Sequence, residues 1–156
     1  PAKEASAPAN AREYFAIARH ALSAYKAAGH LKTFVPPASP VPEVQTAYAI
    51  GHTPGSTVYR FASQGTAINF IGDLIHAPAV QFPHPEVSIH FDVDPKKAIS
   101  SRAQEFNTLA KDGEWMAAAH LPFPGIGHIT AWQQGYSWNP VNYGPYQRAA
   151  NVPLLK

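Results

Sequence analysis

The chain has 156 residues and a formal net charge of +2, and its 12 basic residues are scattered, so the concentrated positive surface of a nucleic-acid-binding protein is missing. Zero cysteines exclude disulfides and thiolate metal sites, so any metal must be held by histidine and carboxylate side chains. No run approaches the ~18 consecutive apolar residues of a membrane helix, and a membrane partner is not expected. Only 14% of residues are charged, which fits a chain whose surface is partly covered by more protein.

Residues 10–28 predict the first helix, because apolar side chains recur there at helical spacing as far as Gly29. Residues 34–42 contain four prolines and connect this helix to the next segment. There is no internal repeat and no boundary that splits the chain, so residues 1–156 are expected to form a single region. The first residue is Pro1 and not Met, which indicates a chain processed or cut from something longer.

Three segments then alternate between apolar and polar residues with a period of two, which predicts strands. Glycine-bearing turns join them, so they are expected to pair as neighbours: residues 44–50, 56–62 and 66–71.

The second helix is predicted to begin at Pro95, with Asp94 as its cap, and to end at Gly113. A short apolar strand follows at residues 115–119, and residues 128–132 predict another. The remaining tail is rich in Gly, Pro, Trp and Tyr and has no clear period.

Three polar residues each follow a predicted strand: His52, Asp73 and His120. Side chains at neighbouring strand ends project into one rim, where loops can build a site. Two imidazoles and a carboxylate that meet there would form a zinc-type ligand set without sulfur. Taken singly, each residue has a structural alternative, since histidines after turns and Gly-Asp at strand ends commonly serve the backbone.

The motifs around these residues resemble the metallo-β-lactamase superfamily, in the right order and spacing. They are Gly-His-Thr-Pro-Gly at 51–55, Gly-Asp-Leu at 72–74, and His-Leu-Pro-Phe-Pro-Gly-Ile-Gly-His at 120–128. The likeness is strongest to the methyl parathion hydrolase group, which is related to the lactonases and arylesterases of the same fold.

The resemblance implies that His52 binds one metal, that Asp73 bridges two metals, and that His120 binds the second. In this family a metal-bridging hydroxide attacks an ester, lactone or phosphotriester. Two zinc ions are therefore expected in the complete site, with manganese, cobalt or iron as other options. Asp73 is the residue assigned to catalysis.

Two features depart from the family. Ser56 stands where the family usually has a second histidine. That histidine is normally not a metal ligand, so the difference concerns the residues around the ligands more than metal binding itself. The His-x-His-x-Asp-His motif of the first half of the fold is absent, and residues 90–92 (His-Phe-Asp) are interpreted as a surface feature. The chain is thus predicted to be the C-terminal half of an αβ/βα sandwich, to bind metal weakly by itself, and to need the N-terminal half as its partner.

Other residues near the motifs receive secondary roles. His128 is assigned to the surroundings of the ligands, with a structural hydrogen bond as the alternative, and His76 and His84 are interpreted as loop residues. Three apolar residues are expected to contact substrate, with core packing as the alternative: Leu74, Phe82 and Phe123.

The predicted function is that of a dinuclear-zinc hydrolase of small-molecule lactones, aryl esters or organophosphate triesters, inactive as this half alone. The alternative is a non-catalytic module that binds a partner through an exposed apolar face. A homodimer is left open, and a periplasmic or secreted location is expected by family analogy only.

Overall fold

The computed structural model describes residues 2–5 and 9–143, and its internal contacts divide the chain into two units, Pro1–Val35 and Pro36–Lys156. The division falls at the proline-rich connection, where the chain forms no regular element. The first unit contains α1 (Ala2–Ala5) and α2 (Ala9–Ala27), and α2 agrees with its predicted range to within one residue. No helix of the described residues is long and apolar enough to cross a membrane.

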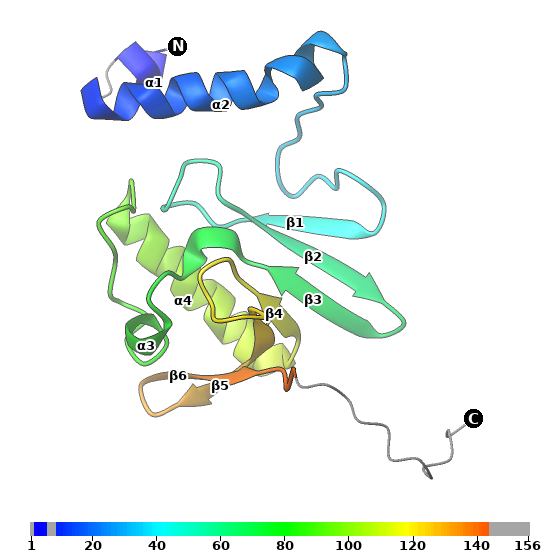
Figure 1. Cartoon of the computed structure of the whole chain (residues 1–156). Coiled ribbons are helices and arrows are strands. Elements are labelled where there is room, and N and C mark those ends of the chain that lie inside the picture. The colour runs from blue at the N-terminus through cyan, green and yellow to red at the C-terminus, as the bar shows by residue number, and fades with distance from the viewer. Residues whose placement is uncertain (1, 6–8, 144–156) are drawn as a thin grey trace. The chain divides into compact units, whose positions relative to one another are not determined.

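The second unit is built on a six-stranded sheet with the order β1-β2-β3-β4-β5-β6 (Figure 1). All neighbours are antiparallel except β3 and β4, which are parallel and are connected through η1 (Gly72–Leu74), α3 (Pro78–Gln81) and α4 (Pro95–Asp112). A parallel pair needs such a crossover connection. The strands are β1 Val44–Tyr48, β2 Thr57–Ser63, β3 Thr66–Phe70, β4 Trp115–Ala117, β5 Ile126–Trp132 and β6 Gly135–Pro140.

The last hairpin differs most from the sequence prediction. β5 begins two residues before the predicted strand, and β6 falls in the tail for which no element is predicted. β6 does alternate, since Tyr136 and Trp138 pack against the core, but its Gly135 and Pro140 are typical of turns. Pairing with β5 along six residues supplies the order that local preference does not.

One face of the sheet packs on α4. The ends of α4 are as predicted: the Asp94 side chain accepts a hydrogen bond from the Lys97 N–H at 3.1 Å, and Gly113 ends the helix in the left-handed conformation with φ 66°. Between these ends, Phe106 and Leu109 of α4 are fully buried. They belong to one core cluster with residues from the strands and loops: Ala49, Val58, Ile71, Leu74, Ile75, Phe82, Met116, Leu121 and Ile129.

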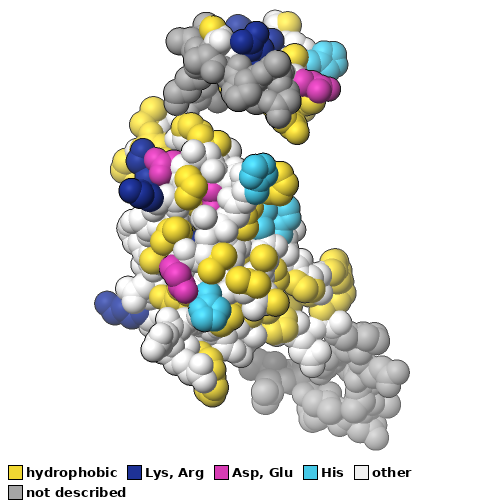
Figure 2. All heavy atoms as spheres, turned by 90° about the vertical axis from the view of Figure 1, so that its left-hand side faces the viewer, with side chains coloured by type: hydrophobic (Ala, Val, Ile, Leu, Met, Phe, Trp, Pro, Cys, Tyr) yellow, Lys and Arg dark blue, Asp and Glu magenta, His cyan; other side chains and the backbone are white. Residues whose placement is uncertain are grey.

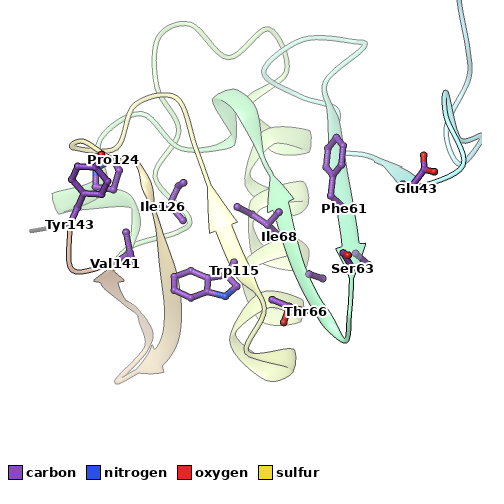
Figure 3. A pocket seen from close by; sticks show the side chains of 12 residues that line it. Glu43, Phe61, Ser63, Thr66, Ile68, Trp115, Pro124, Ile126, Val141 and Tyr143 are labelled. Carbon is purple, nitrogen blue, oxygen red and sulfur yellow. The ribbon is translucent and has the colours of Figure 1, made fainter. Parts of the chain in front are cut away.

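The opposite face of the sheet is also apolar. Alternation along β2 and β3 turns Val58 and Ala67 toward α4, so Phe61 and Ile68 point the other way. Figure 3 shows these side chains with Trp115 and others on the side of the sheet away from α4, around a hollow of about 690 Å³. Phe61 remains 42% exposed. An apolar sheet face of this kind is typical of a surface that packs on further protein.

Candidate metal centre

The structure brings the three predicted residues together at one edge of the sheet. His52 Nε2 lies 3.4 Å from Asp73 Oδ2, and His120 Nε2 lies 3.3 Å from Asp73 Oδ1. Figure 2 shows histidine side chains crowded on one surface of this unit, with hydrophobic side chains beside them. The carboxylate therefore stands between two imidazoles and presents a different oxygen to each.

These distances suit ligands of a common cation. Two donor atoms that each lie ~2.0–2.1 Å from a tetrahedral zinc ion are separated by about 3.3–3.4 Å. Both spacings around Asp73 are longer than the usual ~2.7–3.2 Å of an N–H···O hydrogen bond. Nitrogen and oxygen donors without sulfur suit zinc and other first-row divalent ions. Because each imidazole faces its own oxygen of Asp73, the arrangement fits a carboxylate shared between two ions.

His52 lies in a loop held against the start of α4. Gly51 has φ 139°, and a Cβ at this position would lie 2.0 Å from the backbone nitrogen of Ala98 in α4. The Asp94 N–H donates to the Gly51 carbonyl at 2.9 Å, and Ser101 Oγ donates to the Ile50 carbonyl at 2.8 Å. Only glycine combines this backbone conformation with so close an approach, so Gly51 sets the position of His52.

Asp73 is presented directly after β3, where Gly72 adopts φ 54° and begins the single turn η1. The Ile71 N–H donates to the Ala117 carbonyl at 3.0 Å, which continues the contact between β3 and β4 past the end of β3. His120 follows three residues after Ala117. Parallel pairing of β3 and β4 thus carries Asp73 and His120 to the same edge.

Asp92 fixes the ring of His52, and sequence reasoning missed it. The sequence predicts a surface feature at residues 90–92, which holds for Phe91 but is wrong for Asp92, whose side chain is only 1% exposed. Its Oδ1 lies 3.2 Å from His52 Nδ1, and its Oδ2 accepts a hydrogen bond from the Ile89 N–H at 3.1 Å. A carboxylate behind an imidazole orients the ring and leaves Nε2 free for a metal.

Arg102 of α4 fastens the loops that surround Asp92. It is fully buried, and it donates hydrogen bonds of 2.8 Å to the carbonyls of Leu74, Pro85 and Val87. Burial lowers the pKa of Arg102, and the nearby Asp92 carboxylate opposes this effect. The buried guanidinium has lost its hydration, and three carbonyl oxygens and the Asp92 carboxylate take the place of water. Because Arg102 attracts Asp92, it helps to keep that carboxylate close to His52.

His76 is the second residue that sequence reasoning missed. The sequence favours a loop residue, yet the His76 ring lies between those of His52 and His120, with centroid distances of 4.7 and 4.3 Å. Its Nδ1 is buried and has no hydrogen-bond partner. Burial, and then the neighbouring His120 and His52, lower the pKa of His76 below the ordinary value. Its position three residues after Asp73 was the available signal.

The backbone at His76 is held by a buried amide. Gln81 Oε1 accepts hydrogen bonds from the N–H groups of His76 and Ala77 at 2.8 and 2.9 Å, and its Nε2 donates to the Val87 carbonyl. The imidazole of His76 is therefore carried on a fixed turn.

Of the residues predicted to contact substrate, two lie in the core, which is the alternative interpretation given for them. Leu74 and Phe82 are each only 3% exposed and belong to the core, where Phe82 stacks between Phe106 and Trp138. They follow ligand-bearing segments in sequence, but their side chains point into the protein. Phe123 is 81% exposed and contacts Tyr143.

Two further predicted residues have local contacts. Ser56 Oγ accepts a hydrogen bond from the Thr53 N–H at 3.0 Å, so it closes the loop that carries His52. His128 lies against Trp115 and its Nδ1 is 3.2 Å from the Glu114 carbonyl. The described contacts of His128 match the structural hydrogen bond that was its alternative interpretation, and they lie at the start of β4 and not at its end.

The fold and the cluster together define a class: an α/β protein with a candidate histidine and carboxylate metal site at a sheet edge. No protein-family model and no curated protein sequence matches this chain. Solved structures do match it. A hydrolase of the beta lactamase superfamily, AbOPH, is 35% identical with a TM-score of 0.82, over 90% of this chain and 50% of that one.

Two further structures extend the comparison. The dizinc quorum-quenching lactonase AidC, in complex with a homoserine product, is 27% identical with a TM-score of 0.79, over 89% of this chain and 47% of that one. A probable metal-dependent hydrolase from Staphylococcus aureus shares the fold at 22% identity and a TM-score of 0.53, over 60% of this chain and 33% of that one. The chain shares its fold with hydrolases of the metallo-β-lactamase superfamily, and it spans about half the length of AbOPH and AidC. The expected fold class is thereby confirmed.

Proposed function

We propose that the chain is the C-terminal half of a dinuclear-metal hydrolase that cleaves lactones, aryl esters or organophosphate triesters. The observation that carries the proposal is the placement of His52 and His120 at 3.4 and 3.3 Å from the two oxygens of Asp73. Likeness to a lactonase and to AbOPH supports the reaction class.

The residues of this half are suitable as metal ligands. His52, Asp73 and His120 would bind the ions, with Asp92 keeping the His52 ring in place and Ser56 closing its loop. When bound, divalent ions acidify water and polarise the oxygen of the electrophile. Asp73 is half exposed, so the ligands face a surface that substrate can reach.

A hollow of about 360 Å³ lies beside the cluster, and its apolar lining is consistent with an apolar substrate. Gly72 and Ala119, the chain neighbours of Asp73 and His120, lie on its wall. The other walls are apolar and come from β3, β4 and the loop that leads to β5: Phe70, Ala117, Ala118, Pro124, Gly125 and Ile126. An acyl chain or aryl group can be buried there, since pockets for small ligands are mostly apolar with few polar anchors.

The apolar sheet face supports the missing half as partner. Phe61, Ile68 and Trp115 line a hollow on the side away from α4 (Figure 3). Three ligands spread over two ions leave each short of the about four donors that zinc takes. The N-terminal half would cover this face and supply the remaining ligands. Zinc is proposed as the native metal, with manganese, cobalt and iron as alternatives.

The test is hydrolysis by the complete protein, obtained by joining this chain to an N-terminal half of the superfamily or by co-expressing the two. Each substrate class is assayed with the zinc-loaded protein, after chelation, and after zinc is restored. Activity toward at least one class that is lost on chelation and regained with zinc supports the proposal. A folded complex with two equivalents of zinc and no activity toward any class contradicts it.

The second candidate is a non-catalytic module that binds a partner through the apolar face, and the exposure of Phe61 together with the apolar lining of that face favours it. Metal content separates the two functions. Two equivalents of zinc in the complex with the N-terminal half argue against the module, and none under metal-replete conditions argues against the hydrolase.

A further inference from the structure

We propose that His76 is a metal ligand, and that His52, Asp73 and His76 form a complete site for one divalent ion within this half of the fold. The inference rests on the proposed function only in taking the cluster as a metal site. From the sequence, this chain is predicted to bind metal weakly by itself, because only His52, Asp73 and His120 are counted as ligands. The proposal differs from that prediction because it adds His76.

The first observation is spacing. One donor atom from each of His52, Asp73 and His76 lies within 4.8 Å of the other two. The His52–Asp73 pair is already at 3.4 Å, close to the separation of two ligands on one ion. Rotation of the His76 imidazole would have to bring the third donor to the same distance. Two histidines and one carboxylate, with water in the fourth position, are a known ligand set of catalytic zinc.

The second observation is the state of the His76 ring. Its Nδ1 is buried and has no hydrogen-bond partner. A buried polar atom of this kind is uncommon in native proteins, and a bound ion or water is often what satisfies it. The His76 ring also lies against two other imidazoles, at centroid distances of 4.7 Å to His52 and 4.3 Å to His120.

The third observation is that the His52 ring and the backbone of the other two residues are held in place. Asp92 orients the His52 ring, η1 carries Asp73, and Gln81 holds the backbone of His76 through two hydrogen bonds. These supports come from residues of this chain. A site with fixed ligands loses little entropy when it takes an ion.

The test is titration of this 156-residue chain with Co²⁺ and Zn²⁺ after chelation, with dissociation constants from calorimetry and the coordination sphere from the Co²⁺ absorption bands and X-ray absorption. The wild-type chain is expected to bind one ion at micromolar concentration or better, with two imidazole ligands. His76→Phe keeps an aromatic ring in the stack but removes its donor atoms. This variant is expected to weaken metal binding at least about tenfold. Loss of a residue that only supports a ligand already weakens metal binding by about 10- to 100-fold.

Three controls make the outcome decisive. His84→Ala removes an exposed histidine that pairs with Glu86 on a neighbouring loop, and it should leave binding unchanged. Circular dichroism and tryptophan fluorescence establish that the variants are folded, and His76→Gln provides a second variant. Equal affinity and equal spectra for the wild type and His76→Phe would overturn the inference, and so would the absence of binding by the wild type. Neither of these two binding results bears on the proposed hydrolysis, which is tested separately with the complete protein.

Discussion

The two ends of β4 carry polar clusters of opposite character. Before the strand, Glu114 accepts hydrogen bonds from Arg60, at 2.8 Å from Nε to Oε2, and from Asn69 Nδ2 at 2.8 Å. After the strand, His120, His52 and His76 crowd around the single carboxylate of Asp73. The residues of the first cluster hydrogen-bond to one another, whereas the second contains His76 Nδ1, a buried atom without a hydrogen-bond partner among the described residues. A cluster that protein atoms do not satisfy indicates a ligand from outside the chain.

The largest expected effect is that of His120→Ala in the complete enzyme. Hydrolysis should fall at least about 100-fold, the scale of removing one electrostatic group from an active site. Folding should change little, because the His120 side chain is 45% exposed. Initial rates under saturating zinc and a thermal melt provide the two measurements. An unchanged kcat would show that the unsatisfied cluster has no part in the reaction.

Gly51→Ala tests whether the loop of His52 depends on its contact with α4. The new Cβ would meet the backbone of Ala98 at 2.0 Å, and φ 139° is strained for alanine. The free energy of unfolding should fall by about 3 kcal/mol or more. Urea unfolding measures it, with Gly55→Ala as the matched control, since nothing lies within 4 Å of a Cβ there. Equal losses in the two variants would show that the contact with α4 is unimportant.

Asp92→Asn tests the support behind His52. Removing the negative charge from the partner of His52 Nδ1 should weaken zinc binding about tenfold, as for other residues behind metal ligands. The amide keeps the size of the side chain and can still accept from the Ile89 N–H, so the fold should persist. Competition with a chromophoric chelator measures the affinity. If zinc binds equally well, then Asp92 serves Arg102 and the loop, and not the metal.

Glu114→Gln probes the paired cluster and should have the smallest effect. The hydrogen bond from Arg60 lowers the pKa of Glu114 below its ordinary 4.5. Because folding lowers the pKa of Glu114, its carboxylate stabilises the folded state. This stabilisation is fully present above pH 4.5 and is lost as the pH falls through the pKa of Glu114 in the folded protein.

The substitution should therefore lower the free energy of unfolding by about 1 kcal/mol at pH 7, and the difference from wild type should shrink toward zero as the solution is acidified below that pKa. Urea unfolding at several pH values gives both quantities, and zinc affinity should not change. A difference that is constant with pH would contradict the ion pair, and a changed zinc affinity would contradict the separation of the two ends.

Features encoded by neighbouring residues were predictable. Asp94, Pro95 and Gly113 define the ends of α4 through local capping and backbone chemistry, and these predictions are confirmed. His52 and Asp73 could be placed at one edge because period-two alternation shows where each strand ends. The pairing order that makes those edges coincide is a property of the whole sheet, and alternation within single strands does not encode it.

Features that depend on distant contacts were missed. Asp92 lies 40 residues from His52 in the sequence. Backbone hydrogen bonds from the Val93 and Asp94 N–H groups to the carbonyls of His52 and Gly51 bring the two segments together. His76 acquires its neighbours from two other segments of the chain. Leu74 follows Asp73 in sequence but lies in the core, since nearness in sequence says nothing about the side to which a side chain points.

The central claim is that the unsatisfied cluster binds metal, and anomalous X-ray diffraction at the zinc edge tests it most directly. Crystals of the zinc-replete chain should show an anomalous peak bonded to His52 Nε2 and the Asp73 carboxylate, with each distance near 2.0–2.2 Å, about the usual zinc–ligand separation. A well-ordered cluster with no peak in the presence of excess zinc would contradict the account.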